Sequence, residues 1–204
     1  NILYNAMLHP VAPLAARGLV WYQGEANSGR PDLYAVSLPA WVARLRQRWA
    51  RDNFHFLAVM LPGYGRIIGG DNGDAEFPNN FSWAWFREAQ MKVLDLPYTG
   101  VANTIDLGDL KNIHPSDKAP IGRRLALLAA RDVNRQNIVA EGPRFKEMIV
   151  RDSVVTVSFE NSVGLRTTDG KAPAQFWLAG EDQKWLRAAA EIRGQTVVLS
   201  ADGL

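Results

Sequence analysis

The stretch that decides the fold is "GLVWYQGEANSGRPDLYAVSLPAWVARLRQRWARDNFHFLAVMLP", residues 18–62. It opens with a short apolar run, GLVWYQ, which is typical of a buried strand and leads into a polar loop, GEANSGRP. Residues 33–49 then place apolar side chains three and four positions apart, with arginines between them, which predicts an amphipathic helix. A second apolar run, residues 54–61, stops at a Pro-Gly pair. The stretch therefore predicts a strand, a helix and a second strand, although Pro39 interrupts the helical pattern.

The same alternation continues along the chain. Residues 65–80 are rich in Gly, Asn and Asp and predict a long surface loop. A helical pattern follows at residues 83–94, and residues 100–105 read as a third strand. A third helix is marked by Ile121, Leu125 and Leu128. Strands that alternate with helices in this way predict a parallel α/β sheet over residues 18–132, with helices on both faces.

The pattern changes after about residue 140. The segments EMIVRDSVVTVSFE, AQFWLAGED and AEIRGQTVVLSADG alternate between apolar and polar residues and are separated by turn residues. We therefore expect an α/β part, residues 1–141, followed by a small β-rich module, residues 142–204. The boundary is expected near Gly142-Pro143.

Composition excludes several classes of protein. Hydrophobic residues make up 47% and charged residues 22% of the 204 residues, as in ordinary globular proteins. The net charge of +2 and the lack of a basic run give no sign of nucleic acid binding. No cysteine is available for a disulfide or a thiolate zinc site. No apolar run reaches the roughly 20 residues of a membrane span. No metal-ligand spacing, phosphate loop or dinucleotide motif occurs, so no metal and no cofactor is expected.

Three polar clusters follow the predicted strands. They are Gln23-Gly24-Glu25, Pro62-Gly63-Tyr64, and the segment from Asp106 to His114. Sites in parallel α/β sheets lie beyond the carboxyl ends of the strands, where the three clusters would converge.

His114 is one of three histidines and precedes the third helix. An imidazole is the usual general base at neutral pH, but a helix N-terminus disfavours its charged form. A catalytic histidine here would need a carboxylate beside it, and Asp106, Asp109 and Asp117 are close in sequence. The alternative is a surface histidine before a helix that Ser116 or Asp117 caps.

The segment WYQGEAN, residues 21–27, carries the second set of candidates. Gln23 and Asn27 can donate uncharged hydrogen bonds, which suits an oxyanion hole, and Gly24 would let a ligand approach the backbone. Glu25 could hold a neighbour in place. The alternative is a simple turn at Asn27 with Glu25 in solvent. One ring of the pair Trp83 and Trp85 could also face a cleft and stack on a sugar.

Taken together, the motifs resemble a known family. The segments LYNAMLHPVAP, GLVWYQGEANSGRPDLY, WFREAQ, TIDLGD, NIHPSDKAPIGRRLAL and WLAGEDQKW occur in this order and span nearly the whole chain. They resemble the sialate O-acetylesterase family of SGNH-type bacterial carbohydrate esterases. The resemblance implies a serine esterase on a flavodoxin-like α/β fold, of which residues 1–141 are the C-terminal portion. It also implies that His114 activates the serine and that Gln23, Gly24 and Glu25 line the oxyanion side of the site.

Two features depart from the family pattern. The nucleophile motif of the family, Gly-Gln-Ser-Asn, does not occur among these residues, so we expect it on an N-terminal part of the same protein. Many SGNH esterases have an aspartate three residues before the histidine, where this chain has Lys111. Asp109 is the candidate acid that orients His114, with Asp106 or a backbone carbonyl as alternatives.

The resulting hypothesis is a carbohydrate O-acetylesterase. Its substrate would be O-acetyl sialic acid or acetylated plant polysaccharide oligosaccharides, from xyloglucan or xylan. We expect a periplasmic or secreted protein whose signal peptide lies upstream. The competing hypothesis is a non-catalytic carbohydrate-binding module, which would explain the aromatic residues without a nucleophile.

Overall fold

The computed structural model describes residue 2 and residues 4–64, 82–109 and 111–204. By their contacts, the described residues up to Ala140 form one compact unit and residues Glu141–Leu204 form a second. The predicted loop at 65–80 lies outside the described residues.

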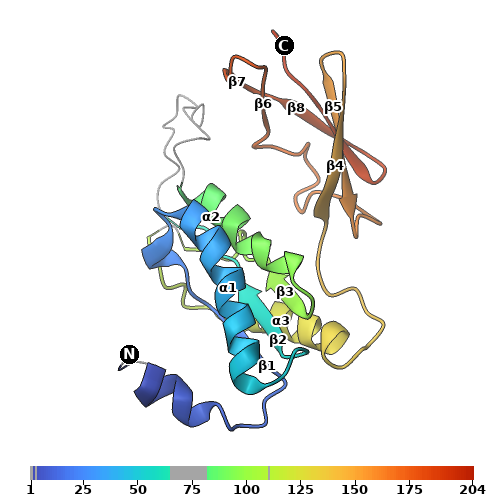
Figure 1. Ribbon diagram of the computed structural model, residues 1–204. Coiled ribbons are helices and arrows are strands. Elements are labelled where there is room, and N and C mark those ends of the chain that lie inside the picture. Colours follow the sequence, from blue (N-terminus) through green and yellow to red (C-terminus); the bar gives the residue numbers. More distant parts are fainter. Residues whose placement is uncertain (1, 3, 65–81, 110) are drawn as a thin grey trace. The chain divides into compact units, whose positions relative to one another are not determined.

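The first unit alternates strands with helices (Figure 1). Its strands are β1 (Gly18–Trp21), β2 (His55–Val59) and β3 (Thr99–Ala102). Its α-helices are α1 (Pro31–Trp49), α2 (Ser82–Met91) and α3 (Ala119–Asp132). Short helical turns occupy Tyr4–Leu8, His9–Val11, Glu25–Asn27 and Lys92–Asp95.

The three strands form a parallel sheet in the order β1-β2-β3, as predicted. One face carries a core in which Val42 of α1, Phe56 of β2 and Phe86 of α2 are fully buried. On the other face, Leu57 and Ala102 pack against Leu128 of α3. Helices therefore cover both faces, and burial of these apolar side chains is the main stabilising contribution.

Helix α1 runs without a break through Pro39. It begins at Pro31, two residues before the predicted start, because proline fits the first turn of a helix, where its missing N–H leaves no hydrogen bond unmade. The helix ends where Ala50 adopts a left-handed conformation with φ of 49° and donates its N–H to the carbonyls of Arg46 and Gln47.

The second unit is built from antiparallel strands, which confirms the predicted β-rich module. Strands β4 (Arg144–Arg151), β5 (Val154–Glu160), β9 (Thr196–Ser200) and β8 (Ala189–Arg193) form one sheet in that spatial order. Strands β6 (Trp177–Ala179) and β7 (Trp185–Arg187) form a separate pair. The core of this unit consists of Val155, Val157, Val197 and Leu199.

Gln90 of α2 holds the end of β2. Its side chain is fully buried, and its Oε1 accepts the backbone N–H of Leu61 at 2.9 Å. Its Nε2 donates to the carbonyl of Val59 at 3.1 Å and to that of Gln23 at 3.3 Å. One amide therefore bonds backbone groups at the end of β2, in the residue just beyond it and in the segment that follows β1, and so joins the two segments.

Replacing Gln90 with methionine keeps the side-chain volume but leaves these buried backbone groups without partners. We expect the free energy of unfolding to fall by about 2–4 kcal/mol, since each unmade buried hydrogen bond costs roughly 1–3 kcal/mol. Urea denaturation measures the loss. The control is Gln47→Met on the exposed side of α1, which should change stability by less than about 0.5 kcal/mol. Equal stabilities of the two variants would contradict this role for Gln90.

Candidate functional site

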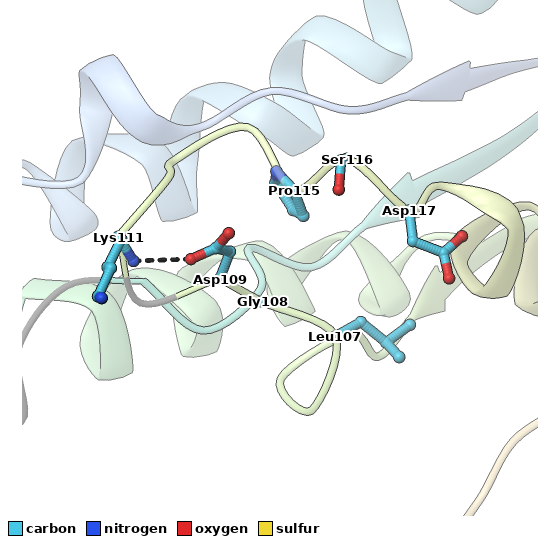
Figure 2. A pocket seen from close by; sticks show the side chains of 7 residues that line it. All are labelled: Leu107, Gly108, Asp109, Lys111, Pro115, Ser116 and Asp117. Carbon is cyan, nitrogen blue, oxygen red and sulfur yellow. Dashed lines mark hydrogen bonds between the residues drawn. The ribbon is translucent and has the colours of Figure 1, made fainter.

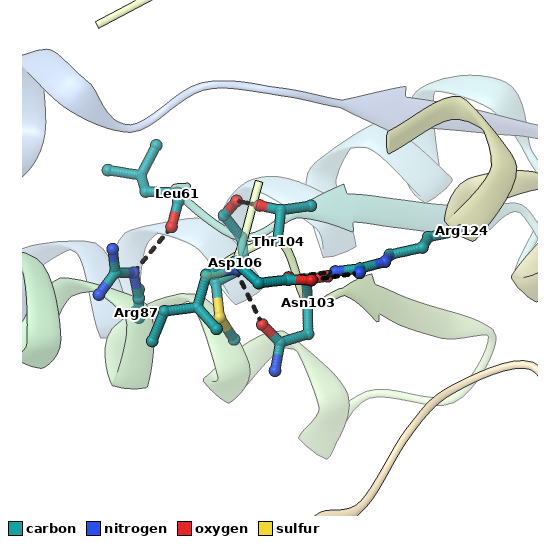
Figure 3. Close-up of polar contacts among 8 residues, drawn as sticks. Leu61, Arg87, Asn103, Thr104, Asp106 and Arg124 are labelled. Atoms are coloured by element: carbon teal, nitrogen blue, oxygen red, sulfur yellow. Dashed lines mark hydrogen bonds and ion pairs between the residues drawn. The ribbon is translucent and has the colours of Figure 1, made fainter. Parts of the chain in front are cut away.

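The segments that follow β2 and β3 meet at the carboxyl edge of the sheet, and side-chain hydrogen bonds hold them in place (Figure 3). Arg87 of α2 donates from Nε to the carbonyl of Leu61 at 2.7 Å and from Nη2 to that of Pro62 at 3.0 Å. The buried Thr104 hydroxyl donates to the carbonyl of Met60. Burial lowers the pKa of Arg87, but the guanidinium stays charged at neutral pH and strengthens both bonds.

Two glycines let the loops after β2 and β3 touch through their backbones. A Cβ atom placed on Gly108 would lie 1.7 Å from the carbonyl oxygen of Gly63. A Cβ atom on Gly63 would lie 3.2 Å from the carbonyl oxygen of Ile105. Only a residue without a side chain fits at position 108, so this contact fixes where the loop that carries His114 begins.

The loop from Asp109 to His114 is shaped by side-chain oxygens that accept backbone N–H groups. Asp109 Oδ1 accepts from Lys111 at 2.8 Å and from Asn112 at 3.2 Å. Asn112 Oδ1 accepts from the N–H of His114 at 2.9 Å. These are Asx turns, in which a short polar side chain takes the place of a backbone acceptor. Asp109 and His114 are thus linked through Asn112, while the structure records no hydrogen bond from the exposed imidazole to a described residue.

A hollow of about 450 Å³ lies along this loop (Figure 2). It is lined by Leu107, Gly108, Asp109, Lys111, Pro115, Ser116 and Asp117. Three of these seven residues carry charges, so the hollow suits a polar ligand. Of the predicted site residues only Asp109 lines it.

The second predicted segment is ordered by a chain of hydrogen bonds. Trp21 Nε1 donates to the Tyr34 hydroxyl at 3.1 Å, and that hydroxyl donates to Gln23 Oε1 at 3.1 Å. Gln23 Nε2 in turn donates to Asn27 Oδ1 at 2.7 Å. An amide nitrogen has two N–H groups, so one remains for a ligand. Gln23 and Asn27 therefore lie together, and Tyr34 holds the Gln23 side chain in place.

Gly24 serves packing in this structure. It is buried, and a Cβ atom there would lie 2.4 Å from the ring of Phe86. The glycine therefore lets the Gln23 segment lie on the core. Glu25 is half-buried. Burial of the phenol groups is the main reason why the pKa values of Tyr22 and Tyr34 are raised, and the negative charge of Glu25 raises both further. Both phenols thus stay neutral at physiological pH.

A cation–π contact joins the two predicted segments. The Lys118 ammonium lies 4.9 Å from the ring centroid of Tyr22, within the range of a favourable interaction. Tyr22 precedes Gln23, and Lys118 ends the loop that contains His114. The Tyr22 hydroxyl is buried and has no hydrogen-bond partner among the described residues.

The other carboxylates near His114 have structural partners. Asp106 forms a bidentate ion pair with Arg124 of α3, with both N–O distances at 2.6 Å (Figure 3). The hydrogen bond from Arg124 is the main reason why the pKa of Asp106 lies below its usual value. Asp117 Oδ1 accepts the N–H of Ala119 at the start of α3. Asp117 thus forms an Asx turn just before α3, whose N-cap residue is Lys118 and not Ser116 or Asp117, as the capping alternative had it.

Sequence reasoning missed four residues that organise this edge: Tyr34, Gln90, Lys118 and Arg124. For Tyr34, Gln90 and Arg124 the only sequence signal is a polar group within a helical pattern, and such a group normally faces solvent. Lys118 is a loop residue before α3 and carries no signal of its own. Of the two tryptophans considered for sugar stacking, Trp85 is 44% exposed, whereas the half-buried Trp83 contacts Tyr64 and Arg87.

The described residues contain no group of three His, Asp or Glu side chains arranged to bind a metal ion. Within the same residues, none of the helices combines the length and the apolar character needed to cross a bilayer.

Comparison with solved structures defines the class of protein. The chain superposes on a carbohydrate acetylesterase from Xanthomonas citri with a TM-score of 0.88 and 34% sequence identity. The match covers 99% of this chain and 46% of that structure. The predicted α/β fold with its β-rich module is therefore the fold of a carbohydrate acetylesterase.

Curated relatives make the resemblance more specific, since they are sialate O-acetylesterases. The protein of Rattus norvegicus is 30% identical over 219 residues, which cover 98% of this chain and 39% of the relative. The protein of Homo sapiens is 27% identical over 218 residues, which cover 99% of this chain and 41% of the relative. The resemblance to sialate O-acetylesterases is confirmed over nearly the whole chain, which spans about two fifths of their length. No family model matches the chain.

Replacing Gly108 with alanine should push the His114 loop away from Gly63. We expect a loss of about 2–4 kcal/mol in the free energy of unfolding, because a methyl group at 1.7 Å from a backbone oxygen forces both loops to move. Thermal denaturation measures the effect. The matched control is Gly122→Ala in α3, where a Cβ atom meets nothing within 4 Å and should stabilise the helix by about 0.5–1 kcal/mol. A Gly108→Ala protein as stable as the control would show that the two loops do not touch.

Proposed function

We propose that the full-length protein is a carbohydrate O-acetylesterase and that this chain supplies its histidine and one side of its oxyanion hole. In the proposal a serine outside this chain attacks the acetyl carbonyl, and His114 takes the serine proton. His114 gives this proton to the sugar oxygen, which leaves as a hydroxyl group while the acetyl group stays on the serine. His114 then takes a proton from water, which attacks the acetyl-serine, and it returns that proton to the serine as acetate leaves. No metal or cofactor takes part.

One observation carries this proposal more than any other. The Gln23 segment follows β1 and the His114 segment follows β3, on either side of β2 in one parallel sheet, and the Lys118–Tyr22 contact links the two segments. Acyl transfer needs a base at the nucleophile and hydrogen-bond donors at the oxyanion that develops on the carbonyl oxygen. The free N–H of Gln23, held by Tyr34 and Asn27, fits the donor role. The names of the relatives support the same chemistry.

The proposed partner is the N-terminal part of the same protein, with a Gly-Gln-Ser-Asn motif. The substrate would be an acetylated carbohydrate, either O-acetyl sialic acid or an oligosaccharide from xyloglucan or xylan. A sialic acid carboxylate would favour an arginine in the site. Arg87 is committed to backbone carbonyls, and Arg30 is exposed beside the Gln23 segment. We propose a periplasmic or secreted location, where such substrates occur.

Replacing His114 with alanine in the full-length protein should lower kcat/KM for p-nitrophenyl acetate by about 10³-fold or more, because the base that deprotonates the serine is lost. The control is His9→Ala, an exposed histidine in the N-terminal segment, which should leave the rate unchanged. Treatment with EDTA should also leave it unchanged. A His114→Ala enzyme with the wild-type rate would refute the proposed base, and a protein that binds acetylated sugars without hydrolysis would favour the binding module.

Asp109 can be tested for two separate roles. Asparagine keeps the Oδ1 acceptor of the Asx turn but removes the charge, whereas alanine removes both. We expect Asp109→Asn to lose less than about tenfold in kcat/KM and Asp109→Ala to lose more, because the carboxylate oxygen already shapes the loop. If Asp109 orients the imidazole as an acid, Asp109→Asn should lose about 10⁴-fold. Steady-state kinetics of both variants distinguish the outcomes.

A further inference from the structure

The two predicted site segments are each held by contacts with other elements. Gln90 of α2 donates to the carbonyl of Gln23 at 3.3 Å, and Gly108 fixes the start of the loop that carries His114. The exposed imidazole makes no recorded hydrogen bond to a described residue, so the backbone of the loop determines where it lies. The far end of that loop is Lys118, directly before α3.

Lys118 is an unfavourable residue for the start of a helix. It is the N-cap of α3, and its side chain makes no capping hydrogen bond. An ammonium group has no acceptor for the free N–H groups of the first turn, and the positive end of the helix dipole repels it. Helix α3 therefore gains nothing from a lysine here. The interaction that the ammonium does make is with the ring of Tyr22, whose centroid lies 4.9 Å away.

Tyr22 offers the face of its ring to this ammonium. The preceding Trp21 packs into the core on the side of α1, where its ring lies 4.5 Å from that of Trp41. Side chains alternate along an extended backbone, so Tyr22 points to the other face of the sheet, where α3 lies. The contact involves the ring and not the hydroxyl, which is buried without a partner among the described residues. Because Gln23 is the next residue, the position of the ring and that of the Gln23 backbone are coupled.

We infer that Lys118 and Tyr22 are positioning residues that set the distance between the His114 imidazole and the Gln23 amide. The inference rests on the proposed function, in which the imidazole serves the serine and the amide serves the carbonyl oxygen of the same acetyl ester. Acyl transfer is sensitive to this distance, because misplacing a reacting group by about 1 Å can cost about 100-fold in rate. Loss of the contact should therefore lower kcat, while KM stays nearly constant.

Removing the charge of Lys118 in the full-length protein separates positioning from support of the fold. Lys118→Gln should lower kcat for p-nitrophenyl acetate by about tenfold and change KM by less than about twofold. Lys118→Arg should restore kcat to within about threefold of the wild type, since a guanidinium also binds a ring face. The melting temperature of Lys118→Gln should not fall, because the lost charge is unfavourable at a helix start. The matched control, Arg123→Gln, removes an exposed charge from the same helix and should keep the wild-type kcat.

A double-mutant cycle tests whether the two residues act as a pair. Tyr22→Leu removes the ring and should lower kcat by about tenfold, whereas Tyr22→Phe keeps the ring face and should stay within about threefold of the wild type. The variant that combines Tyr22→Leu with Lys118→Gln should be at most about twofold slower than either single variant, because one contact can be lost only once. If Tyr22→Leu does not fold, the Lys118 variants decide alone.

Three results would overturn the inference: a wild-type kcat in Lys118→Gln, a loss that arginine does not restore, and losses that multiply in the double variant. The proposed function fails separately. A His114→Ala enzyme with the wild-type rate would refute that function, whereas an inactive His114→Ala enzyme beside a fully active Lys118→Gln enzyme would refute the positioning role alone.

Discussion

The end of strand β2 is the point on which the rest of the first unit depends. The N–H of Met60 still bonds to the carbonyl of Ala102 in β3, but beyond it the backbone leaves the sheet, and the next N–H and C=O groups would be buried without partners. Gln90 and Arg87 from α2 and Thr104 from the β3 side supply those partners. A buried amide without a hydrogen bond costs about 1–3 kcal/mol, so these side chains stabilise an irregular backbone that could not otherwise be buried. The loops of the candidate site are attached to this fixed point.

The same end of the sheet shows how structural and functional requirements share residues. Gly24 packs on Phe86, and Gly108 packs on Gly63, so the glycines of both site segments serve close backbone approach. Tyr34 belongs to the core of α1 and also orients the Gln23 amide. Asp109 builds a turn in the loop that leads to His114. Substitutions at these positions therefore alter local folding as well as any chemistry, and stability has to be measured beside activity.

Much of the fold could be predicted from the sequence, because burial imposes simple periodicities. The strand at residues 18–21 and the helix at 31–49 follow directly from the apolar pattern, and the third strand was placed within a few residues of its bounds.

The polar contacts could not be predicted in this way. The pairing of Asp106 with Arg124 joins residues 18 positions apart on different elements, and Lys118 meets Tyr22 across the sheet edge. Such contacts depend on tertiary geometry, which the periodicity of one segment does not contain. The roles of Gln23, Glu25 and His114 in catalysis remain predictions.

The spatial order of the sheet, β1-β2-β3, is also the order of its strands along the chain. Strands β2 and β3 therefore each pair with a strand that the ribosome has already released, and neither has to be inserted between two strands that are already paired. The buried Arg46 supports the same sequence of events, because its guanidinium donates to the carbonyls of Phe54 and then of Pro97 and Tyr98. It can bind the start of β2 first and receive the start of β3 later. The unit is thus suited to folding from the N-terminal side during synthesis, because each new βα segment can pair with the strand that precedes it in the chain.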